Sequence, residues 1–79
     1  MQTPDTKPGP YYVTAMLDDS SMVYPMAGPY ADHAAALADV ERCRSIAESV
    51  DRRALWAAFG TCRMPTYAKP GKLNQLGLV

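Results

Sequence analysis

The chain has 79 residues, which is the size of one small domain. Hydrophobic residues make up 48% of it and charged residues 20%, a composition too apolar for a disordered protein. It contains no run of about eighteen apolar residues that would span a membrane. The first ten residues lack the basic start and apolar stretch of a secretory signal, so we expect a cytoplasmic protein with two reduced cysteines.

The formal net charge is zero, but charge and proline are unevenly distributed. Residues 11–62 hold seven acidic side chains and four arginines, whereas residues 63–79 hold three basic side chains and no acidic one. Prolines gather at both ends, which predicts a flexible N-terminal arm over 1–10, a folded domain over 11–62 and a C-terminal arm over 63–79. An acidic body argues against a dedicated DNA-binding domain, which would carry a basic face.

The first predicted element is a strand over Tyr11–Leu17, because this segment is rich in aromatic and β-branched residues. Alternation along a strand puts Tyr11, Val13, Ala15 and Leu17 on one face and Tyr12, Thr14 and Met16 on the other.

A polar run over Asp18–Ser21 predicts a hairpin loop, and Met22–Ala27 predicts the return strand. Pro25 has no N–H to donate, so we expect that strand at a sheet edge. Gly28 and Pro29 predict its end.

A helix is predicted from His33 to about Val50, with Asp32 as the N-cap. The segment is rich in alanine and contains no glycine or proline. Its apolar side chains recur at steps of three and four residues and form one stripe, made of Ala36, Leu37, Val40, Cys43, Ala47 and Val50. We expect this stripe to cover one face of the sheet.

The run Ala54–Cys62 predicts a third strand, although its alanines leave open a continuation of the helix. Beyond it, only Lys72–Leu76 favours a short turn of helix. A hairpin followed by a helical crossover gives an α+β fold, ββαβ, with a three-stranded antiparallel-type sheet of spatial order 2-1-3 and one helix on one face.

Three side chains suggest metal binding or nucleophilic catalysis: His33, Cys43 and Cys62. Their spacing lacks a C-x-x-C pair, and His33 and Cys43 lie about 15 Å apart along a helix. Burial on the apolar stripe would raise the pKa of the Cys43 thiol, which disfavours a nucleophile. We therefore expect two buried thiols, a surface histidine, no metal or cofactor, and no enzymatic activity.

The second face of the predicted sheet has no obvious cover, and exposed aromatic and methionine side chains are typical of interaction surfaces. The expected partner-binding residues are Tyr12, Met16, Tyr24, Trp56 and Arg63. Alternatively, the C-terminal arm covers this face with Leu73, Leu76 and Leu78, or a second copy covers it in a homodimer.

A nucleic-acid-binding accessory or regulatory role is the alternative function. It would use the basic residues Arg52, Arg53, Arg63, Lys69 and Lys72. The predicted strands carry no lysine or arginine before Arg63, although an RNA-binding sheet needs them beside its aromatic residues. This disfavours nucleic acid as the partner.

The segment Tyr11–Arg63 resembles short proteins carried by phages and prophages of proteobacteria. The shared features are Tyr11-Tyr12-Val13, Gly28-Pro29-Tyr30, His33, Ala36-Leu37 and an aromatic strand, Trp56-Ala57-Ala58-Phe59-Gly60-Thr61. In size and in this provenance the chain also looks like the anti-CRISPR proteins. The resemblance implies an inhibitor in the host cytoplasm that binds a type I CRISPR effector complex and blocks recruitment of target DNA or docking of the nuclease.

Overall fold

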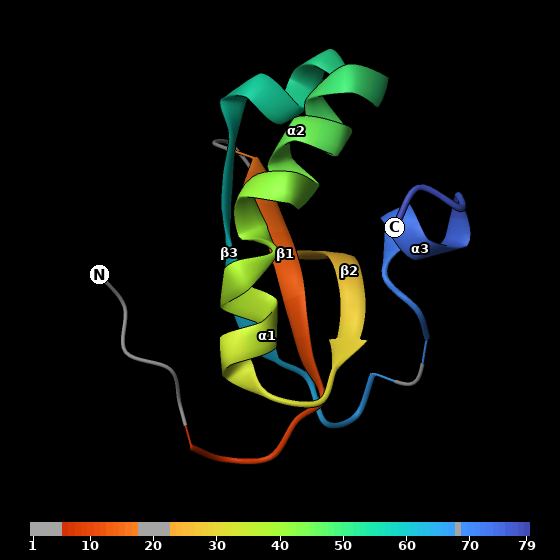
Figure 1. The fold of residues 1–79 in the computed structure, drawn as a ribbon. Coiled ribbons are helices and arrows are strands. Elements are labelled where there is room, and N and C mark those ends of the chain that lie inside the picture. Colours follow the sequence, from red (N-terminus) through yellow and green to blue (C-terminus); the bar gives the residue numbers. More distant parts are fainter. Residues whose placement is uncertain (1–5, 18–22, 68) are drawn as a thin grey trace.

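A computed structural model describes residues 6–17, 23–67 and 69–79 of the chain. Its elements, in chain order, are β1 (Tyr11–Leu17), β2 (Tyr24–Tyr30), α1 (His33–Ala38), α2 (Val40–Val50), a 3-10 helix (Arg52–Trp56), β3 (Ala57–Arg63) and α3 (Lys72–Gln75). The strands form one antiparallel sheet of order β2-β1-β3, and α1 and α2 lie across one of its faces (Figure 1). The predicted α+β class and strand order are confirmed. The predicted hairpin loop, Asp18–Ser21, lies outside the described residues.

The central strand, β1, is buried on both faces over most of its length. Residues 11–15 are each at most 8% exposed. Val13 packs under the helices with Cys43, as the predicted alternation requires, and Tyr11 stacks on His33 of α1. The aromatic and β-branched residues that predicted this strand are therefore also buried residues of the folded protein.

The prediction that Gly28 and Pro29 end the second strand is wrong, because β2 continues to Tyr30. Two register shifts in its pairing with β1 accommodate the irregular backbone, and Tyr30 still lies opposite Tyr11. Gly28 has a φ of 135°, which glycine adopts without strain. Pro29, like Pro25, needs no ladder donor because β2 is an edge strand, as predicted.

The single predicted helix is divided into α1 and α2 at Asp39. The Asp39 N–H donates to Ala36 O in a tight i→i−3 bond, and the Asp39 carbonyl then accepts from Cys43 N to begin the next helix. The carboxylate of Asp39 is held from outside the helix by the Tyr30 hydroxyl at 2.7 Å. Asp32 caps α1 as predicted, accepting from Ala35 N at 2.8 Å.

The third strand begins at Ala57, three residues later than predicted. Asp51 leaves helical geometry at the end of α2, and its carbonyl accepts from Ala54 N in the first bond of the 3-10 helix. Trp56 is consequently the last residue of this helix rather than part of the sheet.

The arm predicted over 63–79 begins with Arg63 still in β3, and its described residues beyond that strand, 64–67 and 69–79, pass around the β2 edge of the sheet. It first crosses the face opposite the helices, where Tyr67 packs edge-on against Tyr12 with ring centroids 5.1 Å apart. The Tyr12 hydroxyl donates to Lys69 O at 2.8 Å. The arm then passes β2 and inserts Leu73, which is 1% exposed, into the core beside α2. The predicted helical turn is confirmed as α3, which lies beside β2 (Figure 1).

Gly71→Ala is expected to lower the free energy of unfolding by about 1–3 kcal/mol, because the new Cβ would lie 2.5 Å from backbone atoms of Ala27. Gly60→Ala is the matched control, since a Cβ there meets no atom within 4 Å. Urea denaturation followed by circular dichroism measures both variants. Equal stability of the two would contradict the close packing of the arm on β2.

Candidate binding cleft

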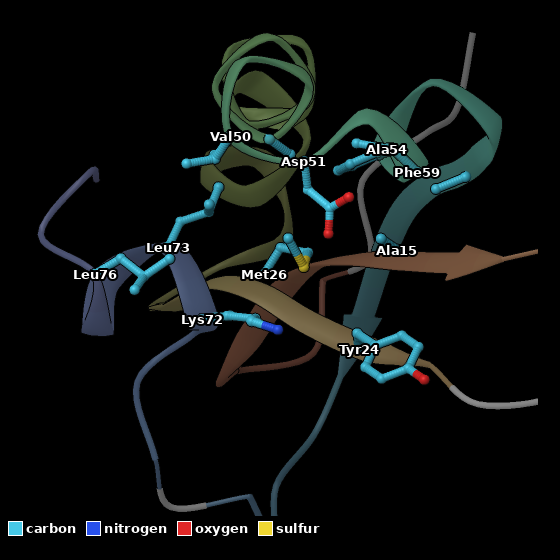
Figure 2. A pocket seen from close by; sticks show the side chains of 12 residues that line it. Ala15, Tyr24, Met26, Val50, Asp51, Ala54, Phe59, Lys72, Leu73 and Leu76 are labelled. Atoms are coloured by element: carbon cyan, nitrogen blue, oxygen red, sulfur yellow. The ribbon is translucent and has the colours of Figure 1, made fainter.

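An open cleft lies between the end of α2 and α3, with the sheet as its floor. We call it the α2–α3 cleft; its volume is about 430 Å³. Its lining residues are Ala15, Tyr24, Met26, Ala47, Val50, Asp51, Ala54, Ala57, Phe59, Lys72, Leu73 and Leu76 (Figure 2). This volume is in the range of pockets that bind small molecules.

Small side chains explain why the cleft is hollow. Ala15 of β1 lies between its cross-strand partners Tyr24 and Phe59 on the floor. Ala47 of α2 stands above the floor, and Ala54 of the 3-10 helix closes one end. Larger residues at these alanines would fill the space, so alanine at these positions keeps the cleft open.

Phe59 is fixed from the helix side. The Arg44 guanidinium lies 5.6 Å from the centroid of its ring, within the range of a cation–π contact. Arg44 is also within 3.7 Å of the Glu41 carboxylate. The contact with Arg44 holds the large apolar surface of Phe59 at one side of the floor.

The rim of the cleft exposes apolar surface. Val50 is 56% exposed at the end of α2, and Leu76 is 58% exposed after α3. Tyr24 is exposed at the edge strand. Covering apolar area is favourable by about 25 cal/mol per Å², so a ligand that spans this rim gains free energy from contact with these side chains.

Two opposite charges line the cleft. Figure 2 shows the Asp51 carboxylate reaching down from the end of α2 and the Lys72 side chain extending from α3 toward the middle. Opposite charges on two sides of an apolar cleft orient a polar ligand group more than they add to affinity.

The structure separates the five residues predicted to bind a partner. Tyr24 lines the cleft on the helix side of the sheet, whereas Met16 is exposed on the opposite face. Arg63 ends β3, and its Nε donates to Pro8 O at 2.7 Å. Trp56 is 73% exposed in the 3-10 helix.

The expectation that Tyr12 lies on an exposed face is wrong, and the alternative that the C-terminal arm covers this face is confirmed at Tyr12. It is 1% exposed, because the C-terminal arm covers it. Burial and the neighbouring Tyr67 raise the pKa of its phenol. Of the three arm leucines expected on this face, Leu73 packs on the helix side instead, and Leu76 and Leu78 are exposed.

Sequence reasoning missed the cleft as a site. Its floor combines residues from three strands with two helix ends, and the position of α3 depends on the path of the arm. The available signals were Val50 at the end of the apolar stripe and the leucines that follow Lys72 in the basic tail.

The predicted surface histidine is buried instead. His33 is stacked on Tyr11 at 4.9 Å between ring centroids, and its Nε2 lies 2.7 Å from Thr61 Oγ1. Cys43 is buried as predicted, and burial raises the pKa of its thiol. Cys62, predicted to be buried, is exposed on the face opposite the helices. Among the described residues, no three His, Cys, Asp or Glu side chains are grouped to hold a metal ion.

A polar cluster surrounds the junction between α1 and α2. Arg42 donates to both carboxylate oxygens of Asp39, at 3.0 and 2.7 Å, and the Tyr30 hydroxyl donates at 2.7 Å. The hydrogen bonds from Arg42 and Tyr30 lower the pKa of the Asp39 carboxyl. Burial and the bond to Asp39 raise the pKa of Tyr30. Tyr30 and Arg42 both donate to Asp39, so all three side chains are engaged within the cluster, and we interpret it as structural.

The basic residues do not gather on one surface. Arg52 precedes one end of β3 and Arg63 occupies the other end, while Lys72 lies beside β2 at the opposite edge of the sheet. No helix within the described ranges has the length and apolar character needed to cross a bilayer.

Comparisons with protein-family models, with curated proteins and with solved structures found no match to this chain.

Asp39→Asn is expected to lower the free energy of unfolding by about 1 kcal/mol near neutral pH, because charge-assisted bonds from partly exposed Arg42 are lost. The folded-state pKa of Asp39 is lowered, so its stabilisation is complete above the unfolded pKa of about 3.9 and is lost as pH falls through the folded value. The stability difference from wild type should therefore shrink below about pH 4, as measured by urea denaturation.

Glu41→Gln is the control for this measurement, since the Glu41 side chain is 80% exposed. It should change stability little at either pH. A difference between wild type and Asp39→Asn that stays constant down to about pH 2 would contradict the assigned role of the carboxylate.

Proposed function

We propose that this chain is a non-enzymatic binding protein whose α2–α3 cleft receives an apolar side chain of a partner protein. The proposal rests on one observation: a cleft with an apolar floor is bordered by the exposed apolar side chains of Val50 and Leu76. Contiguous apolar surface around a concavity is typical of the centre of a protein interface.

The chemistry of the lining supports recognition. It contains no histidine or cysteine, and its charged residues, Asp51 and Lys72, have opposite signs. A partner segment with an apolar side chain flanked by one basic and one acidic group matches both charges. Lys72 and Asp51 would then fix the orientation of that segment while the floor supplies affinity.

The narrower form of the proposal follows the resemblance to phage and anti-CRISPR proteins. In it, the partner is a type I CRISPR effector complex in the host cytoplasm, and binding blocks recruitment of target DNA or docking of the nuclease. A small protein suits this role because stoichiometric binding at one site is sufficient for inhibition.

Leu76→Asp is expected to weaken partner binding at least about tenfold, because it places a carboxylate at the apolar rim. Leu55→Asp is the matched control: Leu55 and Leu76 are each 58% exposed, but Leu55 does not line the cleft. Binding to purified type I effector complexes is measured by surface plasmon resonance, and inhibition by plasmid interference in cells.

Two outcomes separate the general proposal from the narrow one. Absence of binding to any type I complex, with interference unchanged, would exclude the anti-CRISPR role. The cleft itself is probed with the apolar dye anilinonaphthalene sulfonate, whose fluorescence should fall in Leu76→Asp and persist in Leu55→Asp. Equal dye binding by both variants would rule out the cleft as an apolar binding site.

A further inference from the structure

The two edges of the sheet differ in how they are protected. At the β2 edge, Gly71 N donates to Gly28 O at 3.1 Å, and Gly28 N donates to Asn74 Oδ1 at 2.9 Å. Pro25 and Pro29 further remove donors from that strand. Exposed strand edges pair with other chains unless they are covered or interrupted in this way. The β2 edge is therefore closed.

The β3 edge has no such cover within the described residues. Figure 1 shows β3 on the side of the sheet away from β2 and α3. The strand has seven residues and no proline, and its one charged residue, Arg63, stands at its end. That charge is already engaged, since its guanidinium donates to Pro8 O.

The direction of the β3 backbone groups follows from its pairing with β1. Met64 N donates to Pro10 O at 3.0 Å, so Met64 and Pro10 form a hydrogen-bonded pair. Hydrogen-bonded and non-bonded pairs alternate along an antiparallel ladder. The N–H and C=O groups that point away from β1 are therefore those of Ala57, Phe59, Thr61 and Arg63.

We propose that β3 pairs antiparallel with β3 of a second copy of this chain, in a register centred on Gly60, to form a continuous six-stranded sheet. This edge is separate from the α2–α3 cleft, so the inference does not rest on the proposed function.

The Gly60-centred register satisfies every outward backbone group. Phe59 lies opposite Thr61 of the second copy, and Ala57 lies opposite Arg63, so all four outward residues form hydrogen-bonded pairs. No like charges face each other, because Arg63 faces alanine. On the face opposite the helices, Gly60 meets Gly60 and Ala58 meets Cys62, which are small enough for close approach.

The exposure of Trp56 fits the same arrangement. It is 73% exposed immediately before β3, which is unusual for the largest apolar side chain. The register brings it to the end of the paired strands, beside the second copy's Met64. It is also the only tryptophan in the chain, so its fluorescence reports pairing directly.

Cysteine cross-linking tests the register. The Gly60 pair is non-hydrogen-bonded, with Cα atoms about 4.5 Å apart, which is within reach of a disulfide. Gly60→Cys, in a Cys62→Ser background, should form a covalent dimer with oxidised glutathione. Ala58→Cys should also form one with native Cys62. In the wild-type protein, Cys62 is offset from Cys62 of the second copy by four residues, about 13 Å, so these two cysteines should not form a disulfide.

Ala34→Cys in the Cys62→Ser background is the collision control, because Ala34 is exposed on α1. Cross-linking of Gly60→Cys no faster than this control would overturn the proposal. A dimer cross-linked through Gly60→Cys but not through Ala58→Cys with native Cys62 would overturn the register.

Sedimentation equilibrium and Trp56 fluorescence test the unmodified protein, which should dimerise reversibly. Gly60→Glu should weaken the dimer at least about tenfold, because two carboxylates would face each other. Its circular dichroism should stay native, since the added Cβ meets no atom within 4 Å. A wild-type protein that remains monomeric up to about 1 mM would refute the inference.

Discussion

The structure depends on two contacts of the C-terminal arm: main-chain carbonyls of the arm bind the Tyr12 hydroxyl, and Leu73 of the arm packs into the core. A three-stranded sheet with helices on one face leaves its other face exposed to solvent. A domain of this size buries only a modest apolar area, so an uncovered face is a large loss. The arm resolves this by crossing the far face at Tyr12, passing the β2 edge at Gly71 and inserting Leu73 beside Cys43. One segment thereby buries residues on both faces and closes one edge.

The same arm creates the cleft. Leu73 fills the core next to α2, while Val50 and Leu76 line the cleft with the strands beneath them. Alanines on the floor and wall then leave the space hollow. The stability of the domain and the shape of the cleft are therefore coupled, because any change that releases Leu73 also removes one wall of the cleft. Leu76 and Leu55 are both exposed, so substitutions there affect folding less than substitutions at buried Leu73.

The sequence predicted the elements governed by local chemistry. Alternation placed Tyr11 and Val13 on the helix face, Asp32 capped α1, and Pro25 placed β2 at an edge. The sequence-based prediction failed where contacts between residues distant in the sequence determine the local structure. Asp39 interrupts the helix because Tyr30 binds its carboxylate, and His33 is buried because Tyr11 and Thr61 enclose it. Cover of the far face by the arm was one of two alternatives from the sequence, but the route of the arm, which places Tyr67 on Tyr12 and Leu73 beside the cleft, depends on contacts between distant residues.

The anchor of the arm at Tyr12 has a consequence for how this protein can diverge or be engineered. The hydroxyl of Tyr12 is bound by main-chain carbonyls, at Tyr67 and Lys69, which every amino acid provides. These two hydrogen bonds depend on the path of the main chain and not on which side chains residues 67 and 69 carry. Lys69, whose side chain is exposed, can therefore be replaced while its carbonyl keeps the bond to Tyr12, whereas Tyr67 also packs its ring against Tyr12 and is less replaceable.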